Sequence, residues 1–88
     1  MSGDKLRTSI GLAIIGCGDI GKARAEFARM YPAVEWIGVC DVNLDLAKLL
    51  AEEIHADFVT NDASELLSRS ELNAVIIATN ETAHFIPI

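Results

Sequence analysis

The sequence predicts an α/β fold with a parallel β-sheet. Four short apolar segments, typical of buried strands, alternate with three segments that have helical patterns. The first apolar segment runs directly into a glycine-rich turn that opens a helix. Strands joined by helices in this way lie parallel, with right-handed crossovers. At 88 residues, the chain is long enough for one small domain.

The first strand is expected at Ile10–Ile15, because this run is nearly continuous in apolar residues, as in a central strand covered on both faces. The hexapeptide that follows has the pattern G-x-G-x-x-G. Its glycines would allow a tight turn, a close approach of a ligand's pyrophosphate and close packing of the helix on the strand, in that order. The pyrophosphate would lie at the helix N-terminus, where free N–H groups favour an anion. The candidate cofactor-binding residues here are Gly16, Gly18, Asp19, Ile20 and Gly21.

Two interpretations of this turn are open: a dinucleotide site, or an ordinary turn between a strand and a helix. Asp19 is expected to point outward or to cap the helix. The helix itself is expected over Lys22–Met30, and Pro32 ends it. One stripe of this helix is expected to face the sheet, and its members are Ile20, Ala23, Phe27 and Met30.

An acidic residue favours the dinucleotide interpretation. Asp41 directly follows the second predicted strand, Val34–Cys40, and lies 20 residues after Gly21 (41 − 21). A carboxylate at this spacing accepts hydrogen bonds from the ribose hydroxyls of the adenosine. It also favours NAD and makes NADP the weaker candidate, because a 2′-phosphate would face its negative charge. Val42 and Asn43 offer no positive charge to compensate.

The middle of the chain predicts a second helix at Leu44–Ile54, with Asn43 as its N-cap and His55 as a cap favoured by the helix dipole. A third strand is expected at Ala56–Thr60. Arg29, on the first helix, lies off the apolar stripe and is expected to be solvated.

The last part of the chain predicts a short helix that ends near Arg69, with Asp62 and Glu65 at the spacing of a capping box. A fourth strand is expected at Ala74–Ala78. His84–Ile88 is expected to form the first turn of a further helix.

Composition narrows the choice of partners and location. The formal net charge is −6 and the seven Lys and Arg residues are scattered, which argues against a nucleic-acid partner. No apolar run approaches the ~20 residues of a membrane span, and residues 1–9 lack a signal-peptide pattern, so a cytoplasmic protein is expected. Cys17 and Cys40 do not have the spacing of a metal cluster. Both would lie near the ends of neighbouring strands, where a disulfide is conceivable, but reduced cysteines are expected in a cytoplasmic protein.

Residues 10–84 resemble the N-terminal nucleotide-binding domain of the Gfo/Idh/MocA oxidoreductases, the family of glucose–fructose oxidoreductase and inositol dehydrogenase. The matching segments are Ile14–Gly21, Val39–Asp41, Ala47, Ala51–Glu52, Ala74–Thr79 and His84. Family members end the fourth strand with a Thr-Pro-Asn-like turn, and a His starts the next helix. Thr79 and His84 match that pattern, whereas Asn80 and Glu81 replace the Pro and Asn. The resemblance adds Thr79, Asn80 and His84 as contacts on the nicotinamide side.

The resemblance implies a partial Rossmann fold, with four parallel strands in the order 3-2-1-4 and helices on both faces. It also implies hydride transfer between a nicotinamide cofactor and sugars, cyclitols or related polyols. Family enzymes carry a Glu-Lys-Pro motif after the fifth strand and a C-terminal substrate domain, and the sequence has neither. Residues 1–9 are therefore interpreted as a flexible lead and 10–88 as a truncated dinucleotide-binding domain, with no catalytic or metal-binding residue assigned.

Two further hypotheses follow. The first is a non-catalytic module that senses a nucleotide with the same glycines. The second is self-association, or association with a missing remainder of the chain, because Ala74–Ala78 would form an apolar edge with no fifth strand beside it. A chain of this length also buries a thin core.

Overall fold

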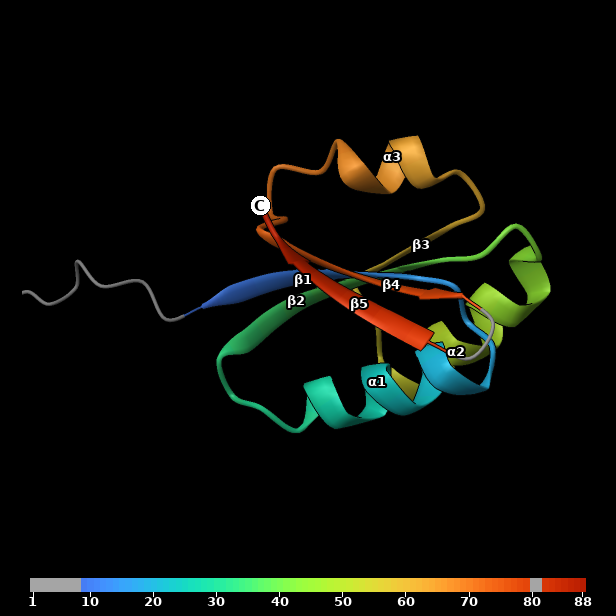
Figure 1. Cartoon of the computed structure of the whole chain (residues 1–88), viewed down its shortest axis with the longest axis horizontal. Helices are drawn as coiled ribbons and strands as arrows, with labels where there is room; N and C mark the ends of the chain where they lie inside the picture. The colour runs from blue at the N-terminus through green and yellow to red at the C-terminus, as the bar shows by residue number, and fades with distance from the viewer. Residues whose placement is uncertain (1–8, 80–81) are drawn as a thin grey trace, which may run out of the picture.

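The computed structural model describes residues 9–79 and 82–88, which form one β-sheet with helices on both faces (Figure 1). The N-terminal lead 1–8 and the pair 80–81 lie outside the described residues. The elements are β1 (Ile10–Ile15), α1 (Asp19–Arg29), β2 (Val34–Cys40), α2 (Leu44–Ile54), β3 (Phe58–Thr60), α3 (Ala63–Leu67), β4 (Ala74–Thr79) and β5 (Thr82–Pro87).

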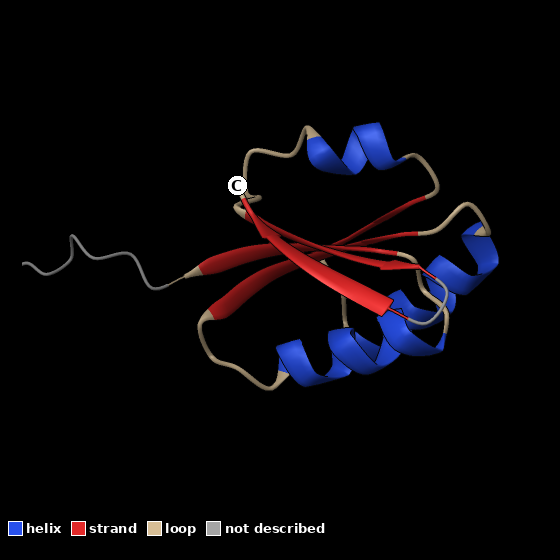
Figure 2. Cartoon of the chain, viewed as in Figure 1, coloured by secondary structure: helices blue, strands red, loops and turns tan. Residues whose placement is uncertain are grey.

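The sheet has five strands in the order β3-β2-β1-β4-β5. The first four pair in parallel, which confirms the predicted order 3-2-1-4. Ile15 lies opposite Cys40 on one side and Ile77 on the other, so β1, β2 and β4 end at the same edge of the sheet. Figure 2 shows α1 and α2 on one face and α3 on the other. This layout positions the loops that follow β1 and β2 side by side.

Each face of the sheet has its own apolar core. Under α1 and α2, Leu12 and Ile14 of β1 pack against Ala25, Leu50 and Ile54. A smaller cluster under α3 contains Ala13, Cys40, Leu66 and Val75. The near-continuous apolar run of β1 is explained by this arrangement, because its side chains alternate between two covered faces.

The face of α1 that meets the sheet differs from the predicted stripe. Phe27 and Met30 are 57% and 74% exposed, whereas Gly21 and Ala25 are buried. Small residues let the helix axis approach the sheet, and a Cβ on Gly21 would come within 1.7 Å of the carbonyl oxygen of Gly16. The prediction was wrong because it weighted apolar size, while the close contact selects small side chains. The helix also starts at Asp19, earlier than the predicted Lys22.

The segment His84–Ile88 does not form a helical turn. Most of it belongs to β5, which pairs antiparallel with β4 and places Phe85 opposite Ile76. The segment's aromatic and β-branched residues favour a strand, and the pairing uses backbone groups along β4 that would otherwise lack partners. The prediction that Ala74–Ala78 is an exposed edge is therefore wrong: β5 covers β4 and is itself the edge.

Side chains cap α2 and α3 at their N-termini. Asn43 accepts hydrogen bonds from the N–H groups of Asp45 and Leu46, at 3.1 and 3.3 Å, which confirms the predicted N-cap. Asp62 accepts from the Ser64 N–H at 3.0 Å and caps α3. The second half of the predicted capping box is wrong, because Glu65 accepts instead from the Thr60 hydroxyl.

The C-terminus of α2 is capped by a side chain from another helix. The Arg29 guanidinium donates to the carbonyls of Ile54 and His55, each at 3.0 Å. His55 is the C-cap residue and has a left-handed backbone (φ 55°). Arg29, expected to be solvated, therefore connects α1 to the end of α2.

Candidate functional site

A pocket of about 440 Å³ lies at the carboxyl ends of β1, β2 and β4. It brings together six of the nine predicted cofactor-binding residues, namely Gly16, Gly18, Asp19, Ile20, Gly21 and Asp41. Residues that were not predicted as cofactor-binding also line it, including Val42, Leu46, Asn61, Ala63 and Ala78. Asn61 directly follows β3, and its position after a strand of a parallel sheet is the one signal that could have identified it.

Two glycines of the loop are required by the protein itself. Gly16 has a φ of 101°, a conformation that is strained for other residues, and a Cβ there would lie 1.9 Å from the carbonyl oxygen of Ala78. A Cβ on Gly21 would lie 1.7 Å from the carbonyl oxygen of Gly16. These positions allow the tight turn and the close helix packing that the hexapeptide predicts.

Gly18 differs from both. Its φ is −77°, which any residue can adopt, and a Cβ there would meet no protein atom within 4 Å. No contact within the described residues therefore requires glycine at this position. Because Gly18 lines the pocket, the open space beside its Cα is available to a ligand that approaches the backbone closely.

The N-terminus of α1 opens on the same pocket. Gly18 is its N-cap residue and offers no side-chain hydrogen bond, whereas α2 and α3 are capped by Asn43 and Asp62. Asp19 is exposed and lies in the first turn, so it follows the predicted outward position and does not cap the helix. The first N–H groups of an uncapped helix favour an anion.

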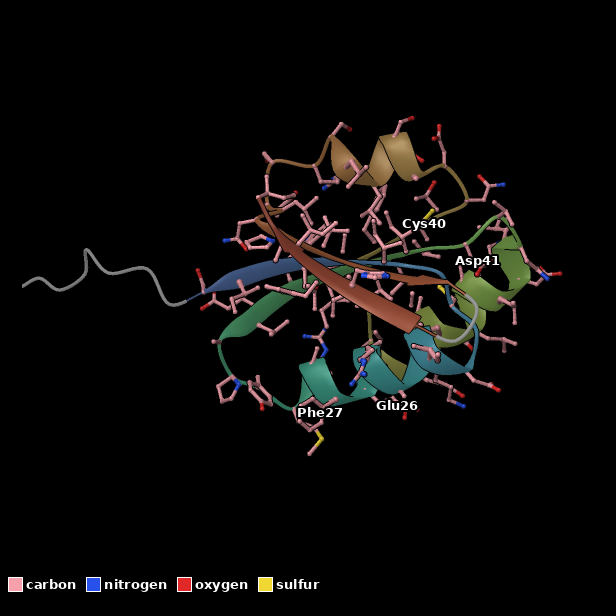
Figure 3. The ribbon with its side chains drawn as sticks, in the orientation of Figure 1. Glu26, Phe27, Cys40 and Asp41 are labelled. Carbon is pink, nitrogen blue, oxygen red and sulfur yellow. The ribbon has the colours of Figure 1, made fainter. Side chains whose placement is uncertain are left out.

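Asp41 contacts the glycine loop directly. Its Oδ2 accepts a hydrogen bond from the Cys17 N–H at 2.7 Å, and its Oδ1 accepts from the Asn43 N–H at 2.8 Å. The residue is half-buried and lines the pocket directly after β2 (Figure 3). Each carboxylate oxygen retains a lone pair that can accept a ribose hydroxyl.

The two cysteines are free thiols in this structure. Cys17 belongs to the core under α1 and α2, and Cys40 to the core under α3, so the sheet separates their side chains. Burial, followed by the negative charge of Asp41, raises the pKa of the Cys17 thiol to about 12. Burial also raises the pKa of Cys40. Both thiols are therefore protonated at neutral pH and are poor nucleophiles.

Of the three residues predicted for the nicotinamide side, the structure describes the backbone position of two. His84 lies on β5, opposite Ile77, and is exposed, so its predicted place at the start of a helix is wrong. Thr79 is the last residue of β4. Asn80 lies outside the described residues.

None of the described helices is long and apolar enough to cross a membrane.

Comparison with known proteins relates this fold to oxidoreductases. Residues 10–88 match the family model described as "Oxidoreductase family, NAD-binding Rossmann fold" (Gfo/Idh/MocA). No match was found among curated proteins.

Among solved structures, GenD2 from gentamicin A biosynthesis, in complex with NAD, is 30% identical with a TM-score of 0.76; the match covers 81% of this chain and 20% of GenD2. A variant of KijD10, a 3-ketoreductase from Actinomadura kijaniata in complex with NADP, is 29% identical with a TM-score of 0.69 over 81% of this chain and 23% of that one. A probable dehydrogenase from Thermotoga maritima is 25% identical with a TM-score of 0.72, over 81% and 21% of the two chains. The chain thus spans about a fifth of the length of these proteins.

Proposed function

The chain belongs to the Gfo/Idh/MocA oxidoreductase family, and from this premise we propose that its pocket binds the ADP half of a nicotinamide dinucleotide. The observation that carries the proposal is the open space at Gly18, beside the uncapped N-terminus of α1. The pyrophosphate would lie against this backbone, and the adenosine ribose would contact the Asp41 carboxylate. When bound, the nicotinamide supplies a hydride donor or acceptor, and this chain's residues hold the other end of the cofactor.

The cofactor we propose is NAD. The Asp41 carboxylate faces the pocket, and the next residue, Val42, brings no positive charge. A 2′-phosphate would therefore meet a negative charge without a compensating cation. Among the similar structures, GenD2 is described with NAD and the KijD10 variant with NADP, so cofactor choice varies between these proteins.

A calorimetric titration of the 88-residue chain with NAD and with NADP tests this choice. We expect NAD to bind at least about tenfold more tightly, which corresponds to ~1.4 kcal/mol. Equal affinities would contradict the role given to Asp41. An absence of binding by either dinucleotide would contradict the proposed function itself.

The substrate class we propose is a sugar, cyclitol or related polyol. The support comes from similar structures, one described as a 3-ketoreductase and another, 26% identical with a TM-score of 0.65, as levoglucosan dehydrogenase in complex with NADH. Assays of a full-length protein that contains this chain, with NAD and a panel of polyols, would test the class. If no polyol in the panel supports the reduction of NAD, the proposed substrate class is contradicted.

We also propose that the chain self-associates through β5. Three large apolar side chains at the end of the chain, Phe85, Ile86 and Ile88, are 60%, 44% and 71% exposed. Residues 82–88 contain no Asp, Glu, Lys or Arg, so two such edges would meet without charge repulsion despite the net charge of −6. The occupant we propose is β5 of a second copy, in antiparallel pairing, because an edge strand presents unpaired backbone groups.

A further inference from the structure

Asp41 lies at the junction of three chain segments that surround the pocket. Its Oδ2 accepts from the Cys17 N–H of the glycine loop, and its Oδ1 accepts from the Asn43 N–H, just before α2. Its own N–H donates to the carbonyl of Thr60 at the end of β3, at 3.3 Å. One residue therefore connects the glycine loop to two neighbouring elements.

Two other hydrogen bonds join the glycine loop to the end of β2 in the described residues. The Gly16 N–H donates to the Cys40 carbonyl at 2.8 Å, which continues the pairing of β1 with β2. The Cys17 Sγ–H donates to the same carbonyl at 3.4 Å, a weak hydrogen bond. Of these hydrogen bonds, the one from the Cys17 N–H to the charged Oδ2 of Asp41 is expected to be the strongest, because charge-assisted hydrogen bonds are roughly twice as strong as neutral ones.

We propose that Asp41 is a positioning residue for the glycine loop: it fixes the backbone that receives the pyrophosphate, in addition to any contact with ribose. The inference deepens the proposed function and rests on it. The carboxylate can serve both roles, since each oxygen has one lone pair in use and one free. A ribose diol can thus bind without displacing the Cys17 N–H, and the loop is ordered before the ligand arrives.

The two roles of Asp41 predict opposite effects on a ligand that has no ribose. Inorganic pyrophosphate is such a ligand. If Asp41 only binds ribose, Asp41→Ala should leave pyrophosphate binding unchanged or strengthen it, because a negative charge beside an anion is removed. If Asp41 positions the loop, Asp41→Ala should weaken pyrophosphate binding despite that electrostatic gain.

The experiment combines this titration with hydrogen exchange of the Cys17 amide in the free protein. We expect Asp41→Ala to accelerate exchange by at least about tenfold, because the amide loses its acceptor, and to weaken pyrophosphate binding severalfold. Asp45→Ala is the matched control: it removes an exposed carboxylate in the first turn of α2, so neither quantity should change.

Unchanged exchange of the Cys17 amide in Asp41→Ala would overturn the proposal, and so would faster exchange with unchanged or tighter pyrophosphate binding. If Asp41→Ala does not fold, Asp41→Asn replaces it: the amide keeps the side-chain shape but offers the Cys17 N–H at most an uncharged acceptor, so exchange should accelerate and pyrophosphate binding should weaken by less than expected for Asp41→Ala. Wild-type protein that binds neither pyrophosphate nor NAD would contradict the proposed function alone. The exchange rate of Cys17 would then decide whether Asp41 holds the loop.

Discussion

The three glycines of the hexapeptide are constrained by different neighbours. A Cβ added at Gly16 or at Gly21 would lie less than 2 Å from a backbone oxygen, whereas a Cβ at Gly18 would point into open space. The protein fold therefore depends on two of them, and the third is available for a ligand. The residues differ in this respect although the sequence pattern treats them alike.

Alanine substitutions should separate these roles in urea unfolding. We expect Gly16→Ala and Gly21→Ala to lower the free energy of unfolding by about 3 kcal/mol or more, because backbone must shift to admit the Cβ. Gly18→Ala should cost about 1 kcal/mol or less, since it changes only an N-cap. Equal losses for all three variants would contradict this distinction.

Local chemistry made part of the site predictable. The hexapeptide and Asp41 were identified because turn geometry and strand ends impose specific residues at fixed spacing. Asn61 and Ala63 were not identified: the position of Asn61 after a strand is a weak signal without a motif, and nothing near Ala63 in the sequence marks a pocket. The contact of Asp41 with the Cys17 N–H was also missed, since it joins residues 24 positions apart.

At the scale of helices and strands, Arg29 is one of the residues that link α1 to α2. Its guanidinium donates to two carbonyls at the end of α2, whose last C=O groups lack partners within the helix. We expect Arg29→Ala to lower the free energy of unfolding by about 1 kcal/mol in thermal or urea denaturation. Arg24→Ala, which removes an exposed arginine of the same helix, is the control and should change it by no more than about 0.5 kcal/mol. Equal effects of the two substitutions would show that the contact contributes nothing.

The bounds of β1, β2 and α2 agree with their prediction, because continuous apolar runs and an Asn N-cap are local signals. The buried face of α1 was not predictable from apolar periodicity, since close packing on the sheet selects Gly21 and Ala25. β5 was missed for a different reason: its conformation depends on pairing with β4, which lies outside its own sequence window.

For the whole molecule, the parallel order of the first four strands was predicted correctly, because crossover handedness and family resemblance leave few alternatives. The edge of the sheet was assigned to the wrong strand. The surface proposed for self-association therefore belongs to β5.

Sedimentation velocity over a range of concentrations tests this surface. We expect wild-type chain to form dimers and Ile86→Lys to sediment as a monomer, because a lysine on an edge strand opposes pairing. Leu49→Lys places the same charge on an exposed apolar residue of α2 and should behave like wild type. A wild-type monomer at all concentrations would exclude β5 pairing.

The central claim is that the pocket beside Gly18 receives a dinucleotide, and the most direct test is the NAD affinity of Gly18→Ala compared with wild type. The added methyl group would occupy space that no protein atom uses. We predict that NAD affinity falls at least about tenfold, or ~1.4 kcal/mol, while the unfolding transition changes little. An unchanged affinity in a folded Gly18→Ala variant would contradict the claim, because the dinucleotide would then bind elsewhere.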